Sequence, residues 1–326
     1  MLNRFLVVLL HFFLIPCFTS FTTTPEKKIQ KQALKTIVID AGHGLPTRNA
    51  QGKYSYESAL TIAMALKIGE RLKQVLPDCN ILYTRADEND AGGITDPNKA
   101  NRYRAQFAND NHGDLFISIH VNTLEDRYQR RIEGYREETY HVYVGKGKKK
   151  KKVTKTREVP IYKSYKLPCN RKGTETYIWA INKYDQKQQS VGSRDADELA
   201  SEGADSSGNY FFDSPDAKIL ASLRTKKYFD QSRTIAGYVE EEFTKLGRQS
   251  EGVKQRNSKG IWVLQATNMP SILVETGFIC NPEEEDYLNS EKGQNEVAYA
   301  VMRAVLRYKH FLETGSGIIP EDTPTK

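Results

Sequence analysis

Short apolar runs alternate along the first part of the chain with longer stretches in which apolar residues recur every three or four positions. Thr36–Asp40, Ile81–Arg85 and Leu115–Val121 are rich in β-branched and other apolar residues, which predicts buried strands. Between them, Tyr54–Leu76 and Asn98–Asn109 have helical spacing. Strands that alternate with helices indicate a parallel or mostly parallel sheet with helices on its faces.

The last part of the chain predicts further elements of the same kind. The expected strands are Thr174–Trp179, Ile261–Leu264 and Ser271–Glu275. A helix is expected from Ser214-Pro215-Asp216, since serine caps the first amides, proline suits the first position and aspartate favours the positive end. This helix should end near Leu246 with Gly247 as its cap, and Glu291–Leu312 should form a closing helix.

The expected fold is therefore one α/β catalytic domain over residues 35–312. It should contain a mostly parallel, twisted sheet of about six strands flanked by helices. Residues 125–172 interrupt the pattern as a lysine-rich insertion, with a solvated tip and a hairpin around Tyr140–Val144. Residues 182–213 are polar and predict a long loop or a loosely held helix, and the tail 314–326 is expected to be frayed.

Positive charge is concentrated in the insertion. The whole chain has a formal charge of +7, whereas Arg127–Lys172 has 16 basic and 4 acidic residues, a local charge of +12 that leaves −5 for the rest. This distribution favours a local contact with an anionic envelope or partner over a protein that binds nucleic acid throughout. The alternative is a solvated loop. The lysine run also lacks the interleaved aromatic residues of a nucleic-acid site.

The N-terminus is typical of a secretory signal peptide, residues 1–22. A short basic start is followed by the apolar run Leu6–Phe18 and a small polar exit. An uncleaved anchor is the alternative, and lipid attachment at Cys17 is conceivable, so membrane contact is expected only through this end. We expect a secreted, periplasmic protein.

Beyond the leader, three widely spaced cysteines remain: Cys79, Cys169 and Cys280. They do not form a disulfide framework, although Cys79 and Cys169 can pair. The sequence contains no CxxC motif, so any metal must be held by histidine and carboxylate.

Two histidines follow predicted strands. His43 comes after Thr36–Asp40, and His120 ends the third strand. Ligands of an open α/β sheet gather at the carboxyl ends of strands. Together with Glu57, at the start of the first long helix, these histidines can hold zinc and leave a fourth position open for water. The alternative for each histidine alone is a satisfied core or loop residue.

Glu275 ends the apolar strand Ser271–Val274. A carboxylate in such a position is costly unless it has a partner or a function. Near zinc, it can act as general base on bound water and then donate the proton to a leaving nitrogen. The alternative is a salt-bridged structural glutamate.

These residues lie within motifs that cover most of residues 35–312. The stretch Ile37–Gly44 followed by Glu57 resembles the N-acetylmuramoyl-L-alanine amidases of the zinc-dependent amidase 3 type. Three later segments resemble other motifs of this family. The first is Tyr83-Thr84-Arg85 with Asp87. The second consists of Arg102, Ala105, Ala108 and Asn109 followed by Asp114–Asn122, and the third is Pro270–Asn281.

The resemblance implies zinc ligands at His43, Glu57 and His120, and a catalytic glutamate at Glu275. It implies hydrolysis of the amide between N-acetylmuramic acid and L-alanine in peptidoglycan. Asn122 is a candidate for orienting His120 or contacting substrate, with strand-end capping as the alternative.

The sequence departs from the family pattern where Leu45-Pro46 follows His43-Gly44, a place where the family usually has another glycine. Some relatives carry a helix near residues 182–213 that covers the zinc site until a partner removes it. Glu198 and Glu202 are candidate plugs in such a segment, and a mobile loop over a groove is the alternative.

Two other functions compete with the amidase. A zinc peptidase that cuts within the stem peptide would use the same metal and base. A non-catalytic protein that binds peptidoglycan or activates another hydrolase would not need the four proposed site residues, which are all present.

Overall fold

The computed structural model describes residues 33–201 and 215–319, with the side chains of 193–201 left out. All of them belong to one compact unit, Gln32–Lys326. The predicted leader, Cys17 and the end of the predicted tail lie outside these residues.

The strands are β1 (Thr36–Ala41), β2 (Asn80–Tyr83), β3 (Leu115–Asn122), β4 (Tyr128–Val144), β5 (Lys151–Lys166), β6 (Thr174–Ile178), β7 (Ser250–Gln255) and β8 (Ser271–Phe278). The helices are α1 (Glu57–Val75), α2 (Pro97–Asp110), α3 (Tyr184–Ser201), α5 (Pro215–Lys245), α6 (Trp262–Ala266), α7 (Pro282–Asn289) and α8 (Glu291–Thr314).

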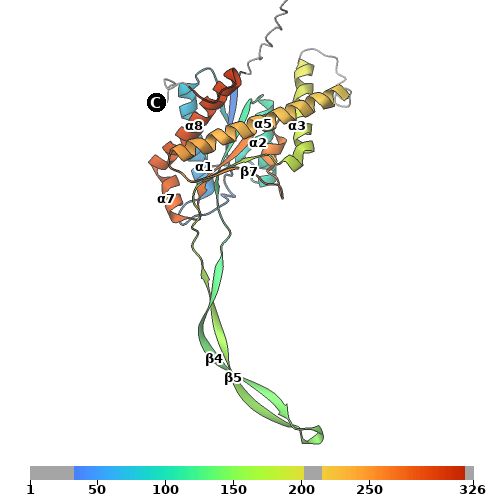
Figure 1. Cartoon of the computed structure of the whole chain (residues 1–326), viewed down its shortest axis with the longest axis vertical. Coiled ribbons are helices and arrows are strands. Elements are labelled where there is room, and N and C mark those ends of the chain that lie inside the picture. Colours follow the sequence, from blue (N-terminus) through green and yellow to red (C-terminus); the bar gives the residue numbers. More distant parts are fainter. Residues whose placement is uncertain (1–32, 202–214, 320–326) are drawn as a thin grey trace, which may run out of the picture. The chain divides into compact units, whose positions relative to one another are not determined.

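Six strands form one mixed sheet in the order β2-β1-β3-β8-β6-β7. Neighbours from β2 to β8 are parallel, β6 runs antiparallel to β8, and β7 is parallel to β6. Helices flank the sheet (Figure 1). The predicted fold class, a mostly parallel sheet of about six strands with helices around it, is confirmed.

The two faces of the sheet bury different clusters of side chains. Ile37 and Ile39 of β1 belong to a large cluster with residues of α1, α5 and α8. Val38, between them, belongs to a smaller cluster with residues of α2 and α6, against which Tyr184 of α3 packs. This alternation follows from the two-residue period of a strand. Phe116 and Leu273 also belong to the smaller cluster. His120 and Glu275 therefore share that face and lie further toward the carboxyl ends of β3 and β8.

The strand predicted at Ile261–Leu264 is wrong. Residues Trp262–Ala266 form the short helix α6, which buries Val263 and Leu264 in the smaller cluster. A short apolar run does not distinguish a buried strand from a buried helical turn. The edge strand is instead β7, whose sequence SEGVKQ is polar and only partly buried, so it has little apolar signal.

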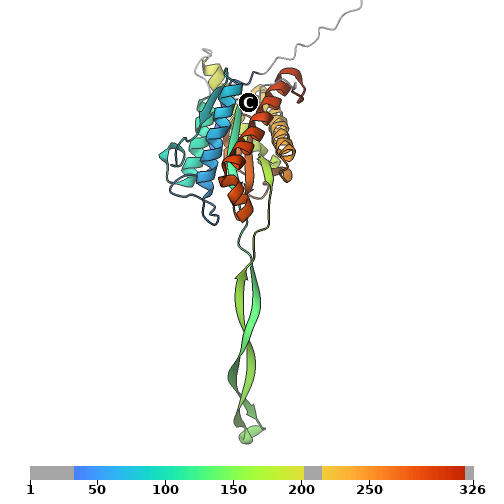
Figure 2. The same cartoon turned by 90° about the vertical axis from the view of Figure 1, so that its left-hand side faces the viewer.

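The lysine-rich insertion forms a long two-stranded hairpin. Strands β4 and β5 pair along their whole length, from Tyr128 opposite Lys166 to Val144 opposite Lys151. They form a sheet of their own, which appears in Figures 1 and 2 as a twisted green ribbon. The expected hairpin is present, but it is much longer than the segment predicted around Tyr140–Val144.

A disulfide joins Cys169, after β5, to Cys280, after β8. The pairing suggested between Cys79 and Cys169 is therefore wrong. Cys79 has no disulfide within residues 33–201 and 215–319, and its thiol donates to the carbonyl of Leu34 at 3.0 Å. A separation of 111 residues gives no sequence signal for the pairing, which depends on the chain returning from the hairpin beside β8.

Residues 184–201 form the helix α3, the second of the two alternatives for this polar segment. Glu198 lies on this helix, with its side chain outside the described set, and Glu202 lies outside the described residues. The first half of α3 is anchored by Lys187, a fully buried lysine. Its Nζ donates to the carbonyls of Leu264, Thr267 and Met269 at 2.6–3.0 Å. It also contacts the hydroxyls of Thr267 and Ser271.

Replacing Lys187 with methionine is expected to destabilise the fold by about 3 kcal/mol, because the buried carbonyls lose their donor. Burial holds the pKa of Lys187 well below its usual value, so the ammonium depends on these five oxygen atoms. Urea unfolding followed by circular dichroism measures the change. Lys226→Met, at an exposed position of α5, is the matched control and should unfold like the wild type. Equal midpoints for all three proteins would contradict the anchoring role.

None of the helices in the described part of the chain is both long enough and apolar enough to cross a membrane.

Candidate active site

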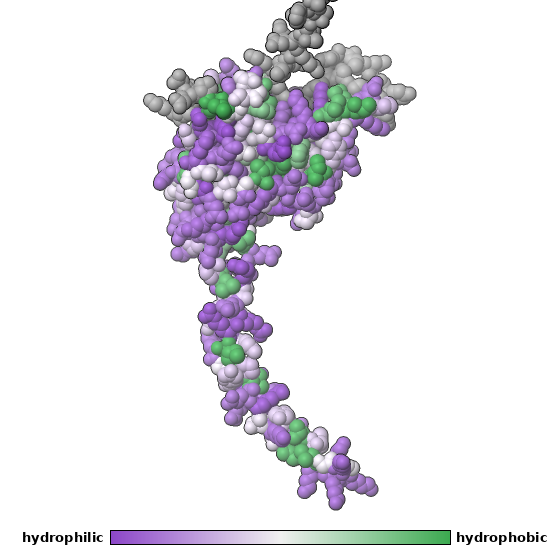
Figure 3. Space-filling view, viewed as in Figure 1, coloured by the Kyte–Doolittle hydropathy of each residue, from purple (hydrophilic) through white to green (hydrophobic). Residues whose placement is uncertain are grey.

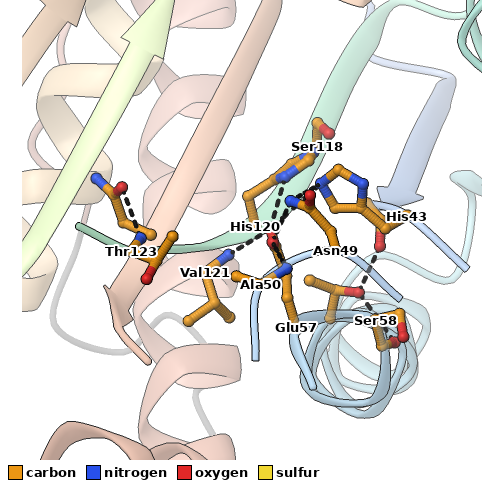
Figure 4. Close-up of polar contacts among 12 residues, drawn as sticks. His43, Asn49, Ala50, Glu57, Ser58, Ser118, His120, Val121 and Thr123 are labelled. Atoms are coloured by element: carbon orange, nitrogen blue, oxygen red, sulfur yellow. Dashed lines mark hydrogen bonds and ion pairs between the residues drawn. The ribbon is translucent and has the colours of Figure 1, made fainter. Parts of the chain in front are cut away.

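His43, Glu57 and His120 come together at the carboxyl ends of β1 and β3, where α1 begins. One possible ligand atom from each residue lies within 4.8 Å of the others. Glu57 Oε1 is 2.9 Å from His120 Nδ1 and 3.5 Å from His43 Nε2. Figure 4 shows the two imidazoles and the carboxylate directed toward one another. The three residues that the sequence analysis selected as metal ligands are thus neighbours in space.

The turn after β1 makes this approach possible. A Cβ atom at Gly42 would lie 2.4 Å from the His120 ring, so only glycine allows the ring to pack against this backbone. His43 then adopts a φ of 58°, in the left-handed region. The carbonyl of Gly42 accepts hydrogen bonds from Thr61 Oγ1 at 2.7 Å and Arg85 Nη2 at 3.2 Å, which hold the turn against α1.

Glu57 is oriented by backbone and side-chain donors. Val121 N donates to Oε1 at 3.1 Å, and Asn49 Nδ2 donates to Oε2 at 2.7 Å. Burial alone would raise the pKa of Glu57, but the hydrogen bond and charge of His120 and the charge of His43 lower it to about 2. The carboxylate is therefore ionised at neutral pH and available to a cation.

The two histidines differ in their environments. Burial and the nearby His120 lower the pKa of His43 to about 4, so its imidazole is neutral at neutral pH. Burial also acts against a charge on His120, but the adjoining carboxylate of Glu57 outweighs it and raises the pKa. The contact between His120 Nδ1 and Glu57 Oε1, 2.9 Å long, is the cause of this rise.

This donor set fits zinc. Two imidazoles and one carboxylate are common ligands of catalytic zinc, which needs three protein ligands and one open position. His43 keeps 28% of its side chain exposed whereas Glu57 keeps 3%, so the cluster is open on one side. Asn49 contacts both Glu57 and His43 Nε2, the latter at 3.0 Å, in the manner of residues that orient metal ligands.

Glu275 lies beside this cluster on the neighbouring strand. It is the register partner of His120 in the β3–β8 pair, which puts both side chains on the same face. Its side chain is buried, and Oε2 has no hydrogen-bond partner within the described residues. Burial raises the pKa of Glu275 to about 7, with the charge of Glu57 adding to the effect and that of His120 opposing it. A buried carboxyl without a hydrogen-bond partner at the end of a strand is a candidate for a chemical role.

Asn122 does not bond to His120. Its Oδ1 accepts from Thr123 N at 2.8 Å, and its Nδ2 donates to Glu175 Oε2 at 3.1 Å. Glu175 is in turn the register partner of Glu275 on β6 and accepts from Lys254 Nζ at 2.7 Å. Sequence analysis missed Glu175 and Lys254. The only available signal was a glutamate in the otherwise uncharged strand Thr174–Ile178.

A buried ion-pair network supports the loop that carries His43. Arg104 pairs with Asp40 and Asp90, and all three side chains are buried. Arg104 Nη2 also donates to the carbonyl of His43 at 2.8 Å. Asp40 accepts from Ser118 Oγ at 2.6 Å. The aspartate of the Asp40–Gly44 motif therefore links β1, β3 and α2 behind the site.

The sequence profile of a known family, described as N-acetylmuramoyl-L-alanine amidase, matches residues 37–307, which is most of the chain. The chain belongs to this amidase family. The family and the class of enzyme predicted from the sequence are thereby confirmed.

Several curated relatives of this amidase are similar at low identity. A putative N-acetylmuramoyl-L-alanine amidase of Buchnera aphidicola (Schizaphis graminum) is 24% identical over 271 residues, covering 83% of the chain and 95% of the relative. The amidase AmiC of Neisseria meningitidis is 36% identical over 106 residues, 32% of the chain and 24% of the relative. An uncharacterized cell wall amidase of Bacillus anthracis is 23% identical over 88% of the chain, which spans only 38% of that relative.

Among solved structures, the CwlD amidase from Clostridioides difficile in complex with the GerS lipoprotein has a TM-score of 0.50. It is 19% identical to this amidase, and the match covers 84% of this chain and 98% of that one. At this identity the likeness shows that the two chains share a fold.

Proposed function

We propose that this amidase uses zinc to hydrolyse the amide bond between N-acetylmuramic acid and L-alanine in peptidoglycan, for cell-wall remodelling or daughter-cell separation. The observation that carries the proposal is the convergence of His43, Glu57 and His120 beside the buried, unpaired carboxyl of Glu275. The family to which the chain belongs supplies the class of bond.

The metal would be held by His43, Glu57 and His120. When bound there, zinc supplies a Lewis acid that polarises the scissile carbonyl and makes water a stronger acid. The chain itself keeps one imidazole neutral, ionises Glu57 and orients that carboxylate with Asn49 and the amide of Val121.

Glu275 would act as the general base and then as the general acid. Its carboxylate accepts the proton of the attacking water, and the resulting carboxylic acid donates that proton to the nitrogen of L-alanine as the amide bond breaks. Its buried position suits both steps, because a raised pKa allows the same oxygen to take and release a proton near neutral pH. Glu175 is the register partner of Glu275 and is hydrogen-bonded to Asn122 and Lys254, and these three residues are proposed to face the stem peptide.

We also propose that the protein works outside the cytoplasm, in the periplasm, after removal of residues 1–22. The Cys169–Cys280 disulfide supports this location, since disulfides persist in oxidising compartments. The leader itself lies outside the described residues, so its support comes from the sequence pattern alone.

The reaction is tested by incubating the chain without its leader with purified peptidoglycan. The metal-free, zinc-loaded and chelator-treated proteins are compared, and released products are identified by mass spectrometry. Release of intact stem peptides only in the presence of zinc supports the amidase. Fragments cut within the stem would instead support the peptidase, and absence of any product would favour a binding protein or a restrained enzyme.

Residues 182–213 are proposed to restrain this activity, with Glu198 and Glu202 as the candidate groups that cover the metal. The support is limited to the face of the sheet: α3 packs on the face that carries His120 and Glu275, with Lys187 anchored at the amino end of β8, and the segment would have to reach the carboxyl end to cover the metal. Removal of this cover by an activator protein would then start hydrolysis. The CwlD amidase was solved with a lipoprotein partner, which makes a protein activator a reasonable hypothesis here.

Deletion of Asp195–Ser207 is expected to raise turnover on purified peptidoglycan by about tenfold or more, the effect of removing a block worth roughly 1.4 kcal/mol. Initial rates of product release measure it. Substitution of Glu198 and Glu202 by glutamine should raise the rate in the same direction without shortening the chain. If both variants keep the wild-type rate and the wild-type unfolding midpoint, the segment does not restrain the enzyme. The alternative, a mobile loop over a groove, would then be favoured.

A further inference from the structure

The end of the hairpin has an unusual distribution of charge. We call residues 139–156 the hairpin tip. It contains seven lysines, Lys146, Lys148–Lys152 and Lys155, and no aspartate or glutamate. Its turn includes the short helix Gly147–Lys149, and all its lysines are exposed. The tip is therefore a compact cluster of positive charge.

In the rest of the hairpin, basic and acidic residues alternate, and three of the basic residues have ion pairs. Arg157 Nη2 is 2.7 Å from Glu138 Oε2, and Lys163 Nζ is 2.8 Å from Glu133 Oε1. Lys166 pairs with Asp126 at 2.7 Å. Within the described residues, none of the lysines of the tip has an ion pair. The stem can thus be stabilised by its own cross-strand pairs, while the charge of the tip is left without a counter-charge.

Apolar side chains lie among these lysines. Val142 is opposite Val153 in the β4–β5 pair, and Val144 lies two residues along on the same face. Val144 is 54% exposed and Val153 is 39% exposed. On the other face, Tyr143 stands opposite Lys152 and is 68% exposed. Among the described residues, the two strands pair only with each other. Figure 3 shows apolar patches along the ribbon above its polar end.

We propose that the hairpin tip binds the surface of a lipid bilayer that contains anionic phospholipids. Lysine ammonium groups next to anionic headgroups gain electrostatic energy while their alkyl stems stay in the interface. The valines and Tyr143 would enter the same interfacial layer, where apolar and amphipathic side chains are buried from water. The tip thereby attaches the amidase to a membrane surface.

The mixture of groups favours a bilayer over a soluble polyanion. A wall polymer or a nucleic acid would neutralise the lysines but would leave Val142, Val144 and Val153 in water. The excess of charge also favours contact with a surface, because it lies at one end of the ribbon: the tip has seven lysines and no acidic residue, whereas residues 128–138 and 157–166 together have six basic and four acidic residues. The inference concerns binding alone and does not depend on the reaction proposed above.

Vesicle co-sedimentation of the chain without residues 1–22 tests the proposal. The truncation leaves the compact unit Gln32–Lys326 whole and removes the apolar leader. Binding is compared on vesicles of phosphatidylcholine alone and on vesicles with about one third phosphatidylglycerol. We expect clear binding to the anionic vesicles and little to the neutral ones. Replacement of Lys148–Lys152 with serine should lower the partition coefficient by about a hundredfold or more, since each lysine near an anionic surface contributes several-fold.

A matched variant removes the same charge from the α/β layers by replacing five exposed lysines with serine. These lysines are Lys73, Lys99, Lys226, Lys259 and Lys292. It should bind anionic vesicles within about threefold of the wild type, because these lysines are spread over the domain and do not form a cluster. Equal losses in the two variants would mean that net charge alone drives binding, and the assignment to the tip would fall.

The apolar part is tested separately with Val142→Ser, Val144→Ser and Val153→Ser combined. This variant should bind anionic vesicles about tenfold more weakly yet bind heparin as well as the wild type. A Val144→Trp reporter should show a blue shift in its emission on anionic vesicles only. Binding to purified peptidoglycan or heparin without binding to vesicles would overturn the proposal, as would an unshifted reporter. Thermal unfolding of each variant checks that the domain stays folded.

Discussion

Replacing Glu275 with glutamine should lower kcat on peptidoglycan by about a thousandfold, within the range typical of a lost general base. Glutamine has the same shape as the buried glutamate but cannot accept the proton of the attacking water. KM should change little, because Glu275 is expected to act on protons rather than to hold the stem peptide. Steady-state rates of product release, measured by chromatography, give both parameters.

Two controls make this result specific. Glu275→Gln should still bind one zinc ion per chain, since Glu275 is not among the three proposed ligands His43, Glu57 and His120. Glu70→Gln, at an exposed position on α1, should keep its rate within about threefold, as surface changes usually do. A kcat for Glu275→Gln close to that of the wild type would exclude the glutamate from proton transfer and leave a structural role.

Replacing Glu57 with glutamine should remove tightly bound zinc and lower activity at least as far as Glu275→Gln does. The amide side chain is a poor metal ligand, and the two histidines that remain do not complete the three-ligand set of catalytic zinc. The affinity for zinc should fall by more than about a hundredfold, beyond the usual effect of changes outside the ligand shell. Metal content after dialysis and competition with a chromogenic chelator measure the loss.

Asn49→Ala is the graded comparison for this experiment. Asn49 contacts Glu57 and His43 without belonging to the converging ligand set, so its loss should weaken zinc binding by about tenfold and leave the metal in place at saturation. Equal zinc affinity in the wild type and Glu57→Gln would mean that the carboxylate serves the histidines by hydrogen bonding alone. A residue other than Glu57 would then have to be the third zinc ligand.

Much of the site was predictable from the sequence because its residues occupy ends of well-marked strands. His43 and His120 follow β1 and β3, whose apolar runs are short and clear, and neighbouring parallel strands bring such residues to one edge. Glu275 was predictable for the same reason, as a carboxyl at the end of an apolar strand. The position of Glu57 near the two histidines was predictable because the helix that begins at Glu57 returns beside β1.

Other features have no local signal. The contacts of Glu175 with Lys254 and Asn122 form because β6, which follows the hairpin, pairs antiparallel with β8. The spacing of residues along the sequence does not predict this pairing. The edge strand β7 is polar, so its pairing with β6 is set by the sheet around it. The length of the hairpin was also hidden, since alternating tyrosines, arginines and glutamates on a two-sided ribbon do not form the apolar face by which strands are identified.

The measurement that tests the central claim most directly is hydrolysis of a defined N-acetylmuramoyl peptide in ¹⁸O-labelled water by the zinc-loaded chain. The account predicts two products, an N-acetylmuramic acid with the label in its lactyl carboxyl group and an intact, unlabelled stem peptide that begins with L-alanine. Label found in a carboxyl group of the stem peptide would show that a different amide is cut. The assignment of this site to the muramoyl–alanine bond would then be contradicted.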